Sequence, residues 1–228
     1  MMRAPVTIVL CLIVACSIAG DSNGAIATTL TVINGSSQTG KVGAQLAVPL
    51  LVQVKDQNGL PAIAVPVTFA ATAGATVGHV TVLSDAAGNA ATRLNLGQVP
   101  GTGTATASAA GVGTTVTFTF TATSGDPAAI AVVSGNNQTK SAGSVLDSAL
   151  VVRVTDQFGN AVAGVAVDWT TNSGTFTSPV QTTSAADGKA SVTFTLSTTP
   201  GVATPTATVR GTTSKAAFTE VGIAPPPT

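Results

Sequence analysis

A repeat at a spacing of one hundred residues constrains this chain more than any other feature of its sequence. When the sequence is slid along itself, the stretch from Val32 to Thr119 matches the stretch one hundred residues later without a gap. Most matched positions are apolar residues or turn residues. The apolar matches include Leu46, Leu50, Val52 and Val54, which fall on Leu146, Leu150, Val152 and Val154. The turn matches include Asp56, Gln57, Gly59 and Gly88, which fall on Asp156, Gln157, Gly159 and Gly188. The repeat therefore predicts two copies of one domain.

Within each copy, apolar residues recur with a period of two, which is the pattern of half-buried β-strands. Gly, Ala, Thr and Val dominate the composition and only 8% of the residues are charged, which also favours strands and turns over helices. About seven such strands separated by turn signals are typical of an immunoglobulin-like sandwich. The predicted fold class is therefore all-β, with two tandem immunoglobulin-like β-sandwich domains.

These patterns also predict where the domains begin and end. Residues 26–123 form the first sandwich, residues 127–221 form the second, and residues 222–228 are a proline-rich tail. Residues 1–20 are expected to be a signal peptide, because Arg3 precedes an apolar run of about ten residues. That run is shorter than the roughly 20 residues that a transmembrane helix needs.

The end of the signal peptide allows two kinds of processing. Ile-Val-Ala-Cys at residues 13–16 resembles the lipobox of bacterial lipoproteins, which predicts cleavage before Cys16 and lipidation of its thiol. The alternative is ordinary signal-peptide cleavage near Ala19 or Gly20. Cleavage before Cys16 implies a location in the cell envelope, as an outer-membrane lipoprotein or on the cell surface, whereas ordinary cleavage implies secretion. Since Cys11 is removed either way, no cysteine pair is expected in the mature domains.

Three segments of the second copy carry a resemblance to a known family. They are Val-Arg-Val-Thr-Asp-Gln-Phe-Gly-Asn at residues 152–160, Val-Ala-Val-Asp-Trp at 165–169 and Ala-Asp-Gly-Lys-Ala at 186–190. Their order resembles the bacterial Ig-like domains of the invasin and intimin type, over residues 28–221. The first copy departs from this pattern, because Leu60 replaces the asparagine and the second turn is longer. The resemblance implies a cell-surface adhesin or a spacer. Phe69 and Trp169 stand where immunoglobulin-like sandwiches place a large core ring, so both are expected in the core.

Few residues are candidates for chemistry. Asp56 and Asp156 are interpreted as turn residues whose carboxylates accept backbone hydrogen bonds. The alternative is a calcium site, which would need the fold to bring in further carboxylates such as Asp85, Asp126 and Asp187. His79, the only histidine, is expected in a loop or at a strand edge, and it leaves no histidine pair for acid–base work or for zinc.

The absence of catalytic motifs predicts a protein that is not an enzyme and has no cofactor and no metal. A net charge of zero argues against nucleic-acid binding. The leading hypothesis is a non-catalytic cell-envelope or surface-displayed module that acts as a structural spacer or binds a protein or glycan, touching the membrane only through the lipid anchor. The alternative is a soluble secreted carbohydrate- or polymer-binding accessory protein, which should expose an aromatic platform. A further possible way to bind is pairing between an edge strand of this protein and a strand of another molecule.

Overall fold

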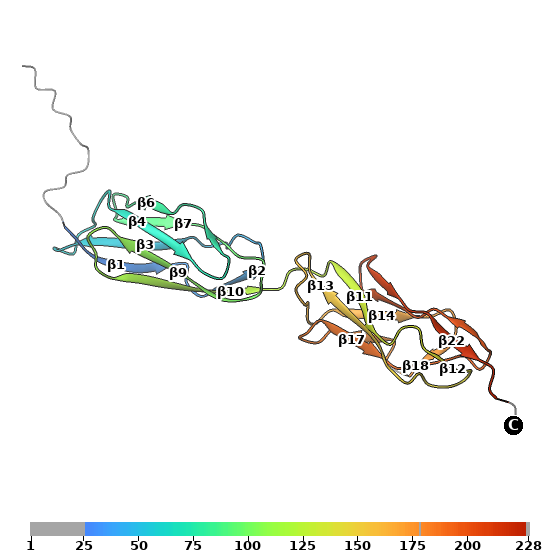
Figure 1. Ribbon diagram of the computed structural model, residues 1–228. Coiled ribbons are helices and arrows are strands. Elements are labelled where there is room, and N and C mark those ends of the chain that lie inside the picture. The colour runs from blue at the N-terminus through green and yellow to red at the C-terminus, as the bar shows by residue number, and fades with distance from the viewer. Residues whose placement is uncertain (1–25, 178, 227–228) are drawn as a thin grey trace, which may run out of the picture.

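The computed structural model describes residues 26–177 and 179–226, and they form two β-sandwiches arranged end to end (Figure 1). A short linker of residues 124–128 joins them. No helix within this part of the chain has the length and apolarity needed to cross a membrane. The predicted signal peptide and Cys16 lie outside the described residues. The all-β prediction with two tandem sandwiches is confirmed.

The first domain is built from a three-stranded and a five-stranded sheet. Their orders are β1-β3-β7 and β2-β10-β9-β4-β6, and β5 pairs with β8 at one end. The strands are β1 (Ala27–Asn34), β2 (Gln38–Lys41), β3 (Leu50–Asp56), β4 (Pro66–Ala71), β5 (Thr76–Val77), β6 (Thr81–Leu83), β7 (Asn89–Thr92), β8 (Leu94–Asn95), β9 (Gly101–Ala109) and β10 (Thr115–Thr123).

The second domain repeats this plan with shorter strands. Its sheets have the orders β11-β13-β17, β12-β22-β19, β16-β14-β20-β21 and β15-β18. The last strand runs past the boundary expected at residue 221 and ends at Ile223. The strands are β11 (Ala129–Ser134), β12 (Thr139–Ser141), β13 (Leu150–Thr155), β14 (Ala166–Thr170), β15 (Thr175–Phe176), β16 (Gln181–Thr183), β17 (Lys189–Val192), β18 (Phe194–Thr195), β19 (Gly201–Ala203), β20 (Thr206–Val209), β21 (Lys215–Ala217) and β22 (Glu220–Ile223).

The edge of each sandwich is shaped by a chain segment that changes sheets. In the first domain β1 pairs antiparallel with β3, and the next strand, β2, pairs parallel with β10 of the opposite sheet. Gly35 lies at the crossing with φ +94°, where a side chain would collide with the carbonyl oxygen of Pro49. Gly135 occupies the same place in the second domain against Ala149. The glycine spacing in the repeat thus reflects a steric requirement.

One predicted strand begins later than its apolar alternation suggested. The alternation starts at Leu46, but β3 starts at Leu50. The side-chain amide of Gln38 bonds both backbone groups of Val48: Nε2 donates to its oxygen at 2.9 Å and Oε1 accepts from its N–H at 3.0 Å. Gln138 does the same to Ser148. Because these backbone groups are already bonded to a side chain, they do not join the strand ladder.

The core consists of the alternating apolar residues. Val52 and Val54 of β3 are fully buried, as are Val152 and Val154 of β13. Phe69 and Trp169 are confirmed as core rings, since their exposed fractions are 1% and 3%. The indole N–H of Trp169, which Phe69 lacks, also has a partner, because Nε1 donates to Thr182 Oγ1 at 2.9 Å. The large rings therefore pack where the repeat predicted them.

A proline explains why the second domain has more sheets. The long strand β9 of the first domain corresponds to two strands, β19 and β20, which are interrupted around Pro205. Proline has no backbone N–H and is tolerated poorly inside a sheet. The partner strand is interrupted opposite this point, between β21 and β22. One substitution relative to Ala105 thus divides a five-stranded sheet into two smaller ones.

Candidate functional site

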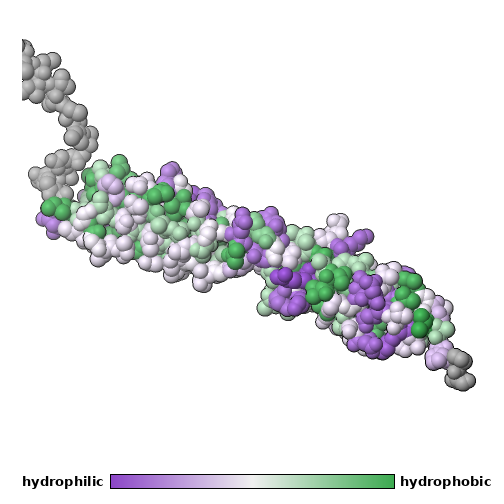
Figure 2. Space-filling view, in the orientation of Figure 1, coloured by the Kyte–Doolittle hydropathy of each residue, from purple (hydrophilic) through white to green (hydrophobic). Residues whose placement is uncertain are grey.

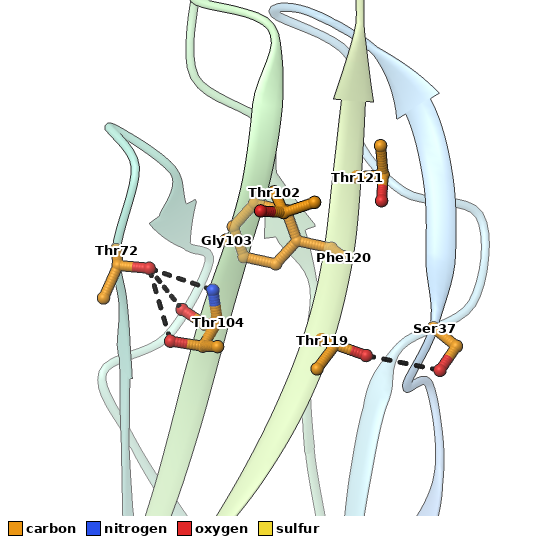
Figure 3. Close-up of a pocket in the computed structure, with 8 residues that line it drawn as sticks. All are labelled: Ser37, Thr72, Thr102, Gly103, Thr104, Thr119, Phe120 and Thr121. Atoms are coloured by element: carbon orange, nitrogen blue, oxygen red, sulfur yellow. Dashed lines mark hydrogen bonds between the residues drawn. The ribbon is translucent and has the colours of Figure 1, made fainter.

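A shallow groove on the first domain is a candidate binding site. It encloses about 590 Å³ over the neighbouring strands β9 and β10 (Figure 3). Most of its lining side chains carry hydroxyl groups, and the complete set is Ser37, Thr72, Thr102, Gly103, Thr104, Thr119, Phe120 and Thr121. No lining residue is acidic, basic or histidine, so the groove offers hydroxyl groups for hydrogen bonds to a neutral polar group.

Gly103 and Phe120 form the floor of this groove. They are cross-strand partners, and a side chain at Gly103 would collide with the Phe120 ring (Figure 3). Phe120 has an exposed fraction of only 3%, so its ring is part of the core. The groove therefore has no aromatic platform of the kind that sugar-binding sites present.

Several of the hydroxyl groups are already bonded within the protein. Thr72 Oγ1 donates to Thr104 O at 3.0 Å and accepts from Thr104 N at 2.9 Å. The Ser37 and Thr119 hydroxyls lie 3.2 Å apart (Figure 3). A ligand in the groove would have to use the remaining hydroxyl and backbone groups. In the second domain Val202 and Ala203 stand at the positions of Thr102 and Gly103, so this lining belongs to the first domain.

The turn interpretation of Asp56 and Asp156 is confirmed. Asp56 Oδ1 accepts hydrogen bonds from the backbone N–H groups of Asn58 and Leu60 at 2.8 and 2.9 Å. Asp156 Oδ1 makes the same two bonds within its own turn, to residues 158 and 160. Each carboxylate thus closes the turn that follows β3 in the first domain or β13 in the second.

Asp156 has two additional partners because it lies beside the linker. Its Oδ2 accepts from the backbone N–H of Gly125 at 2.8 Å and from the Asn160 side chain at 3.0 Å. Burial opposes the charged form, but the hydrogen bonds from Asn160, Gly125 and Phe158 outweigh it and hold the pKa of Asp156 below its ordinary value. This carboxylate is a structural anion that ties the linker to the second domain.

The structure does not bring the aspartates together as a calcium site would require. Asp85 Oδ1 accepts from two N–H groups of its own turn, Asp187 accepts from Lys189, and Asp126 pairs with Lys41 at 2.6 Å. Within the described residues, no group of three His, Cys, Asp or Glu side chains is placed to hold a metal ion. Each carboxylate thus has a separate local role.

His79 is an exposed residue between β5 and β6, as predicted. Its backbone N–H donates to Thr92 Oγ1 at 2.9 Å, and Thr92 Oγ1 donates back to its carbonyl oxygen at 3.1 Å. His79 and Arg93 line a smaller cleft of about 320 Å³. The contacts that hold this loop are made by the His79 backbone.

Sequence reasoning missed a buried carboxylate in the second domain. Glu220 is fully buried in β22, and its Oε2 accepts from the backbone N–H of Gln138 at 2.7 Å. Its Oε1 has no hydrogen-bond partner among the described residues. Burial raises the pKa of Glu220, although backbone bonds from Gln138 and Asn137 partly oppose the shift. The repeat carried a signal, because Glu220 stands where the first copy has Phe120.

The joint between the domains also was not visible in the sequence. Phe158, at the tip of the Asp156 turn, packs against the core of the first domain. Its ring takes the space in front of Gly43, where an added Cβ would lie 2.9 Å from the Phe158 Cζ atom. Asn160 Nδ2 donates to the backbone oxygen of Gln98 at 2.8 Å. The turn end of one domain thus docks onto the far end of the other.

This geometry defines the protein as a tandem immunoglobulin-like β-sandwich protein in which two domains are docked directly end to end. The family model of the bacterial Ig-like domain (group 1) matches residues 129–221, so the second domain belongs to that family. The resemblance inferred from the turn motifs of the second copy is thereby confirmed. The first domain has the same strand plan but departs in its turns, as at Leu60.

Solved structures of other bacterial proteins share the fold. The chain is 18% identical to the Escherichia coli adhesin FdeC, with 85% of this chain and 64% of that chain covered at a TM-score of 0.52. It is 21% identical to Yersinia pseudotuberculosis InvD, with 86% and 58% covered, again at a TM-score of 0.52. This chain thus spans roughly three fifths of each of those two structures. A comparison with curated protein sequences gives no match.

Proposed function

We propose that this protein is a non-catalytic module of the bacterial cell surface that acts as a spacer or as an adhesion module. The observation that carries the proposal is the docked joint, in which Phe158 packs on the first domain and Asn160 bonds to it. A joint of this kind stiffens a pair of domains and holds the outer one away from the attachment point. The ends and faces of the sandwiches then act by contact.

The chemistry of the surface supports a role in contact. The groove over β9 and β10 offers hydroxyl groups and no ionisable side chain. Figure 2 shows hydrophilic residues gathered near the joint and over the second domain, while the visible face of the first domain is mostly of intermediate hydropathy. FdeC, whose fold this chain shares, is an adhesin. The ligand that we propose is a protein or a glycan on an opposing surface.

Attachment to the envelope is the part of the proposal that can be tested first. We infer that cleavage before Cys16 leaves a lipidated N-terminus, which makes the protein an outer-membrane or cell-surface lipoprotein. Wild type and Cys16→Ala would be expressed with the signal peptide in a bacterial host, fractionated and analysed by intact-mass spectrometry. Wild type should carry acyl mass on Cys16 and sediment with membranes, and the variant should not. A mature chain that starts near Ala19 or Gly20 and is free in the medium would contradict lipid anchoring.

The second candidate is a soluble secreted carbohydrate- or polymer-binding accessory protein. The uncharged groove of the first domain supplies hydroxyl groups that can bond a neutral sugar, but it lacks the aromatic platform expected of such a site. Titration of neutral oligosaccharides into wild type and Thr102→Val would distinguish the two. Val202 occupies the matching place in the second domain, so the substitution is compatible with the fold. Saturable heat in wild type that the variant loses would move this candidate ahead.

A further inference from the structure

The far end of the second domain repeats the surface on which Phe158 docks. In the first domain this surface, here called the receiving end, consists of residues 41–44 and 97–98, and its main chain is held by Gly43 N donating to Gly97 O at 2.9 Å. In the second domain Gly143 N donates to Ser197 O at 2.8 Å. Leu96 N donates to Ala44 O at 2.8 Å, and Leu196 N donates to Ser144 O at 2.9 Å. The two receiving ends therefore share one backbone framework.

Among the described residues, the two ends differ in what lies in front of the glycine. Gly43 faces the Phe158 ring, whereas the nearest atom to an added Cβ on Gly143 is Thr198 Cγ2 of the same domain, at 3.6 Å. The space at this end is a cavity of about 420 Å³, lined by Gly143, Gly174, Thr175 and residues 195–198. None of the lining residues is charged, and Leu196 is an apolar residue among them. A cavity of this size and polarity accommodates an aromatic ring.

The chain itself shows what kind of group fits. The Phe158 turn reads Asp-Gln-Phe-Gly-Asn, and its asparagine bonds a backbone oxygen, which is Gln98 O at the joint. The second receiving end also has a backbone carbonyl at the corresponding position, Thr198. The free turn of the first domain carries Asn58 and Leu60 instead of the phenylalanine and the asparagine. A second copy of this chain therefore presents the wrong turn to the cavity.

We propose that the receiving end of the second domain binds the turn end of another Ig-like domain, one that carries an aromatic residue at the position of Phe158. The partner is another domain of the same class. Its ring enters the cavity in front of Gly143, and its asparagine donates to the backbone oxygen of Thr198. This inference rests on the proposed function of the protein as a contact module, and it names the class of partner.

The test transfers the Phe158 turn to the free end of this chain. The double variant Asn58→Phe/Leu60→Asn presents the docking pair on an exposed turn, and both replaced residues are exposed in the structure. The unlabelled variant would be titrated into ¹⁵N-labelled wild type and amide shifts recorded. We expect saturable shifts at Gly143, Gly174 and Thr198. Loss of an aromatic anchor typically weakens the affinity of an interface by well over tenfold. Unlabelled wild type, which lacks this anchor on its exposed turn, should therefore bind roughly tenfold more weakly than the double variant or not at all.

Two controls make the outcome decisive. Thr198→Arg in the labelled protein fills the cavity and should abolish the shifts, while the backbone spectrum of each variant reports that it is folded. If the folded double variant causes no shifts at Gly143, or if Thr198→Arg leaves them unchanged, the proposal is wrong. Equal shifts with wild type as titrant would make a second copy the occupant and would also overturn it. Since the test uses purified protein, it is independent of Cys16 and of cellular location.

Discussion

At the scale of single residues, buried polar groups were the hardest feature to predict. Ser84 is buried, donates to Ala62 O at 2.6 Å and accepts from Val65 N at 2.9 Å, and Ser184 makes the equivalent pair of bonds. Both serines have satisfied partners, and the repeat preserves them. Glu220 differs, because one of its carboxylate oxygens is buried with no hydrogen-bond partner among the described residues. An unsatisfied buried polar atom costs roughly 1–3 kcal/mol.

Glu220 should therefore make the second domain less stable as the pH rises. Its folded pKa lies above the ordinary value of 4.5, so the folded state binds the proton more tightly than the unfolded chain. The stabilisation is present below the unfolded pKa and is lost as the pH rises through the folded pKa. Glu220→Gln removes this dependence and keeps an acceptor for the Gln138 N–H, so it should be more stable at neutral pH by about 1 kcal/mol.

Urea unfolding of wild type and Glu220→Gln at a series of pH values would measure the effect. The carboxylates with lowered pKa values, such as Asp156, act in the opposite sense at lower pH and are common to both proteins. The difference between the two free energies of unfolding therefore isolates Glu220. If the free energies of unfolding of the two proteins change with pH in parallel across the titration of Glu220, the proposed effect of Glu220 is contradicted.

At the scale of strands, alternation predicted which residues face the core better than it predicted where a strand begins or ends. The buried side of β3 followed the pattern, yet the strand starts at Leu50 because Gln38 holds the backbone of Val48. The short strands β5 and β8 have only two residues each, which is too few for a periodic signal. Strand ends depend on which partner takes each backbone group.

Pro205→Ala should rejoin β19 and β20 into one strand like β9. Phe218 N donates to the Pro205 oxygen at 2.8 Å, so these residues form a hydrogen-bonded pair in which only one bond can be made. Alanine supplies the missing N–H, aimed at the Phe218 oxygen. Hydrogen exchange read by NMR should show a protected amide at residue 205 and slower exchange at Thr206. Rapid exchange at residue 205 in the folded variant would show that another constraint interrupts the strand.

At the scale of the whole molecule, the joint decides whether two sandwiches behave as one rod. Phe158 belongs to the second domain in sequence but packs on the core of the first. Asp156 ties the linker at Gly125, and Lys41 pairs with Asp126. The Lys41 pair is exposed and is expected to contribute little. The aromatic contact is therefore the main constraint on the angle between the domains.

Phe158→Ala should loosen the joint without unfolding either domain. The side chain lies outside the core of its own domain, so the stability of each domain should change by less than about 0.5 kcal/mol. Small-angle X-ray scattering should show a broader distribution of interatomic distances for the variant. Gln157→Ala is the matched control, because the neighbouring residue is exposed in the same turn. An unchanged distribution would mean that the linker alone sets the angle.

The repeat and its alternation by themselves determined the all-β class, two tandem sandwiches, the core faces and the turn roles of Asp56 and Asp156, because each depends on residues close in sequence or on strict periodicity. Only the tertiary structure decided that Phe158 meets Gly43, that Glu220 is buried and that Gly103 lies over Phe120. Each of these contacts joins residues that no local pattern links. The groove and the joint depend on such contacts, because packing brings together side chains that are distant along the chain.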